Sequence, residues 1–266
     1  MQRSYQRTND QMRPVTLTRD VIKHALGSCL AQFGDTHVLC TATVAPVLPK
    51  WRMYSHEGWI TAEYAMLPAS TAKRSPREYK GRKGRSMEIE RLIGRSLRTV
   101  VDLKALGERA ITLDCDVIQA DGGTRTAAIT GAWVALHDAL MALVEKGDLP
   151  RLPLTNQVAA ISVGRVAGEL LVDLDYKEDS HADVDMNIVG VPGRALIEIQ
   201  GTGEKTPFDR AQLDDLLDRG QDAINQLLNL QNQVTGFRET TASADDSDAA
   251  SSTGNITDAA EKHVDE

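Results

Sequence analysis

The 266-residue sequence predicts a mixed α+β fold. Segments with helical periodicity alternate along the chain with short β-branched segments, which indicates that helices and strands interleave. Several strand pairs are separated only by short turns, so they are expected to be antiparallel rather than part of a doubly wound parallel sheet. Hydrophobic residues make up 41% of the chain and aromatic residues only 4%, so aliphatic side chains must fill the core. A chain of this length can bury a sizeable core.

Four elements are predicted in the first half of the chain. A strand over residues 36–44 follows the turn residues Gly34 and Asp35 and is rich in β-branched side chains. Residues 86–103 place apolar side chains at helical spacing. A second strand is expected over residues 110–118. It is followed by a largely buried helix over residues 125–146.

The second half predicts two hairpins and a closing helix. Residues 158–165 and 169–175 flank Ala167 and Gly168, and residues 184–189 and 195–200 flank a turn rich in glycine and proline. Residues 209–230 have the amphipathic pattern of a helix that closes the domain. The sequence contains no internal repeat of 20 to 50 residues.

The net negative charge of the chain comes almost entirely from its carboxyl end. Residues 239–266 hold eight acidic residues and one lysine, so they account for −7 of the formal net charge of −8. The preceding residues carry 30 acids against 29 bases. We therefore predict one folded domain over residues 1–238 and a disordered acidic tail over residues 239–266. The tail is expected to be a solvating appendage, and an interaction role is the alternative.

Nothing in the sequence predicts export or membrane insertion. Residues 1–10 lack the apolar stretch of a signal peptide. The longest apolar run, residues 132–144, contains His137 and Asp138 and is too short to cross a bilayer. The three cysteines, Cys29, Cys40 and Cys115, lie in apolar surroundings without a CxxC pair, so they are predicted to be buried, reduced thiols. These features predict a cytoplasmic protein without a membrane partner.

The most informative run is Asp-Gly-Gly-Thr-Arg-Thr at residues 121–126, just before the long helix. Its glycines allow the backbone to approach a ligand closely, and Thr124 is expected to cap the helix. Free N–H groups at a helix start bind phosphate, and the Arg125 guanidinium matches two phosphate oxygens. Arg85 precedes the helix predicted over residues 86–103, so a phosphate would meet both arginines if the two helix starts are adjacent. Each arginine taken alone is more typical of a solvated helix end.

Residues 173–185 contain six carboxylates, which repel one another unless a cation is bound. Two carboxylates together with phosphate oxygens are an ordinary Mg²⁺ site, and Asp179 and Asp185 are the candidates. Asp183 shares a strand face with Asp185 by the period of two, so one of them can simply be exposed. An acidic surface turn is the alternative interpretation.

Residues 73–85 carry seven bases and one acid, with Pro76, Gly81 and Gly84 opposing regular structure. A mobile basic loop of this kind favours a polyanion, and a merely solvated loop is the alternative. A phosphate site, a Mg²⁺ site and a polyanion loop together indicate phosphoryl transfer on a nucleic acid, with inorganic phosphate as nucleophile. Neither a complete P-loop nor a G-x-S-x-G nucleophile elbow occurs.

The sequence resembles the bacterial ribonuclease PH family over about residues 6–238. The resemblance is carried by six segments in one order: Asn-Asp-Gln-Met-Arg-Pro-Val (9–15), Phe-Gly-Asp-Thr (33–36), Gly-Trp-Ile-Thr-Ala-Glu-Tyr (58–64), Met-Glu-Ile-Glu-Arg-Leu-Ile (87–93), the run from Asp114 to Thr126, and Gln-Gly-Thr (200–202). It implies a ribosomal protein S5 domain 2-like fold. It also implies a homohexamer, a trimer of dimers, that acts on precursors of transfer RNA and other RNA 3′ ends.

The resemblance further implies the reaction. Family members are phosphorolytic 3′→5′ exoribonucleases, or tRNA nucleotidyltransferases, that trim nucleotides beyond the CCA end of transfer RNA and take part in RNA processing. They release nucleoside diphosphates with inorganic phosphate as co-substrate, use Mg²⁺ or Mn²⁺, and can add nucleotides in reverse.

The resemblance also assigns residues. By position it implies phosphate-binding roles for Arg85, Gly123, Thr124 and Arg125, and metal-binding roles for Asp179 and Asp185. Arg85, Arg125 and the two aspartates would be the catalytic set. It implies RNA binding by Arg74 and Arg77. Ala69 stands where the family usually has arginine, and Lys80, Arg82 and Lys83 are expected to compensate.

Two other functions stay open at this point. One is a catalytically silent RNA-binding ring subunit, which the joint presence of the two arginines and two aspartates disfavours. The other is a hydrolytic nuclease, which would need a water-activating cluster beyond the single acidic segment.

Overall fold

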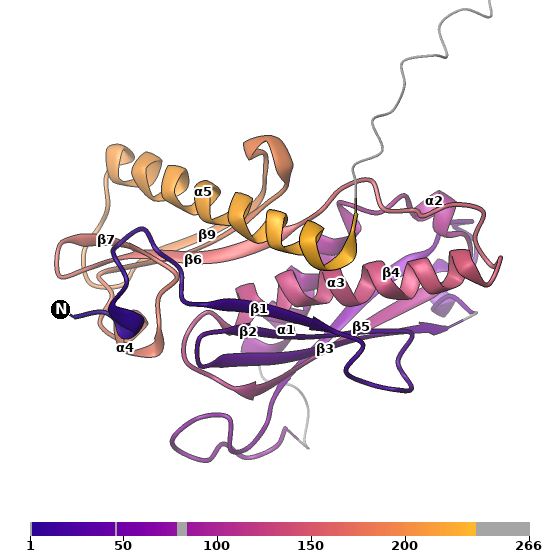
Figure 1. Cartoon of the computed structure of the whole chain (residues 1–266), viewed down its shortest axis with the longest axis horizontal. Coiled ribbons are helices and arrows are strands. Elements are labelled where there is room, and N and C mark those ends of the chain that lie inside the picture. Colours follow the sequence, from indigo (N-terminus) through magenta and orange to yellow (C-terminus); the bar gives the residue numbers. More distant parts are fainter. Residues whose placement is uncertain (1, 46, 79–83, 238–266) are drawn as a thin grey trace, which may run out of the picture.

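The computed structural model describes residues 2–45, 47–78 and 84–237. These residues form two β-sheets with helices packed against them, which confirms the predicted α+β class and the S5 domain 2-like fold (Figure 1). The predicted tail, residues 239–266, lies outside the described residues.

The first sheet has five strands in the spatial order β1-β2-β3-β5-β4. Their bounds are β1 (Val15–Arg19), β2 (Gly27–Phe33), β3 (Thr36–Ala45), β4 (Trp59–Met66) and β5 (Ala110–Gln119). Neighbouring strands are antiparallel except β4 and β5, which are parallel. Parallel neighbours need a crossover, and α1 (Gly84–Arg98) and α2 (Leu103–Leu106) provide it. Buried and accessible residues alternate along β3, β4 and β5, as expected for a sheet covered on one face.

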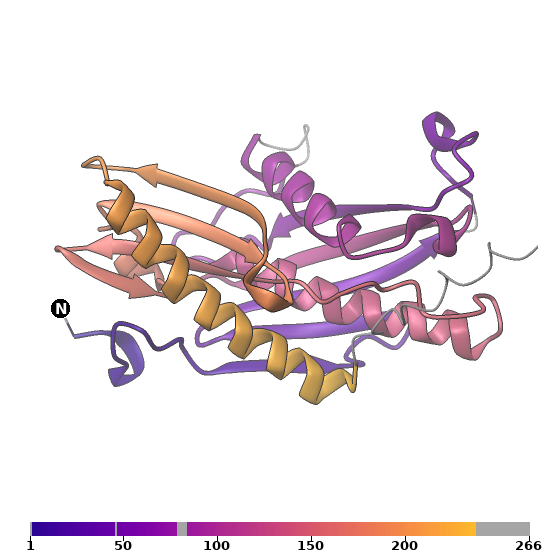
Figure 2. The ribbon, with the colours of Figure 1, turned by 90° about the horizontal axis from the view of Figure 1, so that it is seen from above.

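The second sheet has four antiparallel strands in the order β7-β6-β8-β9. They are β6 (Ala159–Val166), β7 (Glu169–Val172), β8 (Val184–Gly190) and β9 (Leu196–Gly203). Both predicted hairpins are confirmed, although β7 ends at Val172, earlier than predicted. Helix α5 (Arg210–Thr235) lies across β6 and β8, and Asp209 forms a capping box at its start (Figure 2).

Helix α3 (Thr124–Glu145) is the core helix that joins the two sheets. It packs against β2 and β3 of the first sheet and against β6 of the second. By length and composition it would also suit a membrane span, but 78% of its most apolar window is buried inside the protein. Burial on nearly all sides explains why this helix is apolar around its circumference.

Small residues let α3 approach the first sheet closely. A Cβ atom on Gly27 would lie 2.0 Å from the carbonyl oxygen of Ala135, and one on Gly131 would lie 3.0 Å from the sulfur of Cys40. All three cysteines are buried and free, as predicted. Burial raises the pKa of the Cys29 thiol to about 12, so that thiol stays protonated at neutral pH.

The structure corrects the prediction of one helix over residues 86–103. Helix α1 starts earlier, at Gly84, so the last two residues of the predicted basic loop are helical. It ends at Arg98, and Asp102 then caps the separate helix α2 by accepting hydrogen bonds from the N–H groups of Lys104 and Ala105.

Strands β1, β2 and β4 were not predicted. In β2, glycine, serine and alanine occupy covered positions, so the alternation of large apolar and polar side chains is absent there.

Candidate functional site

The predicted anion site is a turn between β5 and α3, and we call residues 121–125 the phosphate cradle. Gly122 and Gly123 have φ angles of 76° and 65°, a left-handed conformation that favours glycine. The first backbone hydrogen bond of α3 runs from the N–H of Ala127 to the carbonyl of Gly123. The N–H groups of Thr124, Arg125 and Thr126 therefore precede the intrahelical hydrogen bonds and can bind an anion.

The prediction that Thr124 caps the helix is wrong. Gly123 occupies the N-cap position, because the two left-handed glycines turn the chain before Thr124, which is the first helical residue. The Thr124 hydroxyl instead pairs with the Tyr64 hydroxyl at 2.8 Å, and both side chains are buried. Burial raises the pKa of Tyr64, which keeps its hydroxyl protonated. The cradle is thus tied to β4 as well as to β5.

The two predicted arginines lie at two helix starts that line one cavity. Arg85 is in the first turn of α1 and is exposed, whereas Arg125 is in the first turn of α3 and is only partly accessible. The Arg125 guanidinium donates to the side-chain oxygen of Gln200 on β9 at 3.1 Å and lies 3.4 Å from a carboxylate oxygen of Glu88 on α1. These contacts from both sides orient Arg125.

Asp179 and Asp185 line the same cavity, which has a volume of about 350 Å³. Asp179 is the last residue of the short helix α4 (Tyr176–Asp179), and Asp185 is the second residue of β8. The other lining residues are Met66, Thr71, Ala120, Gly122, Ser162, Leu174, Tyr176 and Asn187, together with the predicted Arg85, Gly123, Thr124 and Arg125. The structure thereby brings together every residue predicted to bind phosphate or metal.

Both carboxylates have a raised pKa, because each is ionised in an unfavourable environment. Burial raises the pKa of both, and the charge of Asp179 raises that of Asp185 further, to about 6, against the opposing effect of Arg125. A divalent cation would relieve this repulsion. Within the described ranges, no group of three or more His, Cys, Asp or Glu residues could hold a metal ion. Two carboxylates completed by phosphate oxygens and water match Mg²⁺, which keeps several waters.

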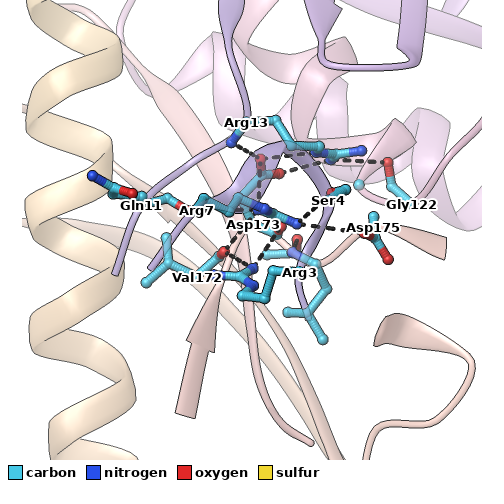
Figure 3. A network of polar contacts seen from close by, with 12 residues as sticks. Arg3, Ser4, Arg7, Gln11, Arg13, Gly122, Val172, Asp173 and Asp175 are labelled. Carbon is cyan, nitrogen blue, oxygen red and sulfur yellow. Dashed lines mark hydrogen bonds and ion pairs between the residues drawn. The ribbon is translucent and has the colours of Figure 1, made fainter. Parts of the chain in front are cut away.

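Three carboxylates of the acidic segment, those of Asp173, Asp175 and Glu178, are paired with buried arginines. We call residues 173–179 the carboxylate arm. In Figure 3, Arg3, Arg7 and Arg13 converge on its carboxylates. Arg3 and Arg7 each form a close ion pair with Glu178, at 2.7 and 2.8 Å. Asp179 and Asp185, the two carboxylates predicted to bind metal, are the only carboxylates of residues 173–185 that line the cavity.

The buried Asp173 carboxylate shows why this network is stable. Burial raises the pKa of Asp173, but the charge and hydrogen bonds of Arg13 outweigh it and hold the pKa below its usual value. The Arg13 side chain is completely buried and binds both Asp173 oxygens, at 2.9 and 2.7 Å. A bidentate pair of this kind compensates for the desolvation of both charges.

Of the predicted RNA-binding residues, Arg77 lies next to the site. It lines a second cavity of about 610 Å³ that shares Arg85 and Met66 with the first. Burial raises the pKa of Asp116, another residue of this cavity, and the positive charge of Arg77 partly offsets that increase. Arg74 is exposed and lines neither cavity. Lys80, Arg82 and Lys83 lie outside the described residues.

Sequence reasoning missed several cavity residues. Asn187 follows Asp185 by two positions on β8, so the period of two could have placed both side chains on one face. Gln200, which orients Arg125, is the register partner of Asn187 on β9. Ser162 accepts a hydrogen bond from the N–H of Leu174, and no local pattern predicts that contact.

The fold and the cavity together define the class: an α+β protein whose two sheets bring an anion-binding helix start and a pair of carboxylates into one site. The sequence agrees with this class. Residues 11–142 match domain 1 of the 3′ exoribonuclease family (RNase PH) and residues 156–223 match its domain 2. The chain belongs to the ribonuclease PH family of 3′ exoribonucleases.

Three solved structures share this fold. A chain of the Archaeoglobus fulgidus exosome with RNA bound to the active site is 24% identical, with a TM-score of 0.73, over 85% of this chain and 91% of that one. Rrp46 of rice (Oryza sativa) is 20% identical, with a TM-score of 0.70, over 88% and 100%. An archaeal exosome core chain is 23% identical, with a TM-score of 0.68, over 85% and 88%. At these identities the likeness shows the shared fold.

Proposed function

We propose that this protein is a phosphorolytic 3′→5′ exoribonuclease that trims transfer RNA precursors beyond their CCA end. The observation that carries the proposal is the cavity in which Arg85, Arg125 and the start of α3 face Asp179 and Asp185. Membership of a 3′ exoribonuclease family supports the 3′ end of an RNA chain as the substrate. Arg77, which is exposed beside the cavity, supports a negatively charged polymer as the substrate.

In the proposed reaction, an oxygen of inorganic phosphate attacks the phosphorus of the last phosphodiester. The bond from that phosphorus to the 3′ oxygen of the preceding nucleotide breaks. A nucleoside diphosphate leaves, and the shortened RNA takes up a proton as its new 3′ hydroxyl. The attacking group is already an anion, so no strong general base is needed. A diphosphate bond replaces a phosphodiester of similar free energy, which also allows nucleotide addition in reverse.

The chain's own residues would position the reactants. Arg85, Arg125 and the N–H groups of the cradle hold the phosphate and offset its repulsion from the RNA. Asp179 and Asp185 would hold Mg²⁺ or Mn²⁺, which when bound neutralises non-bridging oxygens of the reacting phosphate. Arg77, with Arg74, Lys80 and Arg82, would bind the RNA backbone.

The proposal extends to assembly and location. We propose a homohexameric ring, a trimer of dimers, in the cytoplasm. Similarity to chains from exosome cores supports a ring-forming fold. Light scattering combined with size-exclusion chromatography would test the subunit number.

One assay tests the activity. Transfer RNA with a 3′ extension is incubated with the protein and Mg²⁺, with and without inorganic phosphate, and the nucleotides released are identified. Nucleoside diphosphates that appear only with phosphate support the proposal. Monophosphates released without phosphate would indicate a hydrolytic nuclease instead. Binding without cleavage would indicate a silent RNA-binding subunit.

A further inference from the structure

We propose that Arg13 and Thr36 are positioning residues that hold the phosphate cradle at a fixed distance from the carboxylate arm. This inference rests on the proposed function, because the cradle and the arm carry the two halves of that site. Neither side chain lines the cavity. Arg13 lies in residues 9–15 and Thr36 in residues 33–36. Both segments carry the family resemblance, but neither contributes a residue predicted to bind phosphate or metal.

Arg13 joins the cradle to the arm through one guanidinium group. On the arm side it binds both oxygens of Asp173, and its backbone N–H donates to the same carboxylate at 2.8 Å. On the cradle side it donates to the carbonyl oxygen of Asp121 and, at 3.4 Å, to that of Gly122 (Figure 3). The planar fork of arginine fixes the direction of these bonds, which lysine cannot do.

Thr36 fixes the backbone of the cradle from the side of β3. Its hydroxyl donates to the carbonyl oxygen of Gly122 at 2.6 Å and accepts from the N–H of Asp121 at 3.0 Å. The Thr36 hydroxyl oxygen also accepts a hydrogen bond from the Arg13 guanidinium at 3.3 Å. Thr36 is fully buried, so water cannot replace these bonds without rearrangement.

The cradle and the arm also touch directly. A Cβ atom on Gly122 would lie 2.5 Å from the carbonyl oxygen of Leu174 and 2.8 Å from the backbone nitrogen of Tyr176. A shift of the cradle toward the arm is therefore blocked by backbone atoms. Arg13 opposes the reverse shift, away from the arm, and Thr36 holds both Arg13 and the cradle to β3.

Arg3 and Arg7 hold the far end of the arm. Arg3 donates to Glu178 and to the carbonyl of Val172, and Arg7 donates to Glu178 and to the carbonyl of Asp173. Glu178 in turn completes the capping box of α4, whose last residue is Asp179. A continuous chain of buried and partly buried hydrogen bonds thus connects the cradle to Asp179. Reacting groups displaced by about 1 Å can lose 100-fold in rate, so this chain matters for catalysis.

Thr36→Val tests the proposal, because it removes the hydroxyl and keeps the shape. Thr130→Val is the matched control. Thr130 is also fully buried, and its hydroxyl donates to a carbonyl and accepts from an N–H, both of Ala160 between α3 and β6. Thr36→Ser restores the hydroxyl and is the rescue variant. For each protein we would measure KM for phosphate, KM for RNA, the melting temperature, and inorganic phosphate binding by calorimetry.

We expect Thr36→Val to raise KM for phosphate about tenfold, because it removes the three hydrogen bonds of the hydroxyl and leaves their partners unpaired. KM for RNA should stay within about twofold of the wild-type value. Thr130→Val should lower the melting temperature to a similar extent and leave KM for phosphate unchanged. Thr36→Ser should return KM for phosphate to within about twofold of the wild-type value.

An unchanged KM for phosphate in Thr36→Val, or the same increase in Thr130→Val, would overturn the positioning role. Arg13→Lys provides a second test if Thr36→Val folds poorly, and it should weaken phosphate binding while keeping the charge. The calorimetric titration separates the two proposals. If the wild-type protein binds phosphate but releases no diphosphates, the proposed function fails, and the weaker binding expected of the variants still tests the positioning role.

Discussion

Asp185→Asn should stabilise the metal-free protein at neutral pH. Folding raises the pKa of Asp185 from its ordinary 3.8 to about 6, chiefly by burial and then by repulsion from Asp179. The folded state therefore binds more protons than the unfolded state between these two values. Stability must fall as the pH rises through this window, because Asp185 ionises in an unfavourable place. Asparagine resembles the protonated acid and avoids this cost.

The size of the effect follows from the pKa. Each pKa unit corresponds to about 1.36 kcal/mol, so the ionised carboxylate costs the metal-free fold at most about 3 kcal/mol above pH 6. Asp185 is only partly buried, and solvent screening reduces the expected gain to about 1–2 kcal/mol. Below pH 4 the variant and the wild-type protein should be equally stable.

Urea denaturation of both proteins at pH 4, 5, 6 and 7.5, in EDTA, measures this difference. The stability of the variant minus that of the wild type should rise with pH and level off near pH 7. Mg²⁺ added at pH 7.5 should stabilise the wild type and leave Asp185→Asn nearly unchanged, because the variant lacks one of the two proposed ligands. A variant less stable than the wild type at pH 7.5 without metal would refute the reasoning. So would a difference that does not depend on pH.

Three further predictions address the cradle and the RNA surface. Arg125→Ala should lower phosphorolysis by at least about 100-fold while RNA binding, measured by filter retention, survives; full activity would contradict the cradle assignment. Gly122→Ala should lower the free energy of unfolding by about 2–4 kcal/mol, because its Cβ would meet the carbonyl of Leu174. Gly147→Ala is its control, since Gly147 also has a positive φ but open space around it, and a loss of about 1 kcal/mol is expected there. Arg77→Ala should raise KM for RNA and weaken its salt dependence without changing KM for phosphate, and an effect on phosphate alone would contradict its role.

The elements that were predicted correctly are those whose signals are local. The strand over residues 36–44 and the hairpin around Ala167 and Gly168 depend on side chains within a few positions of one another. The helix predicted over residues 86–103 shows the limit of this approach. Its apolar spacing continues past Arg98, but the chain leaves the helix there, Val101 pairs with the distant Leu154, and Asp102 caps a new helix.

By itself, the sequence determined the α+β class, the order of most elements and the composition of the phosphate cradle. The cradle could be recognised because Gly122, Gly123 and Arg125 are neighbours in the chain. Only the tertiary structure decided that Arg13 binds Asp173, 160 positions away, so that this carboxylate is paired with an arginine and does not line the cavity. The local spacing of residues indicates which backbone conformation a segment prefers and on which face of a helix or strand a side chain lies. The partner of a buried charge is selected when the sheets pack together, because only burial makes an unpaired charge too costly to tolerate.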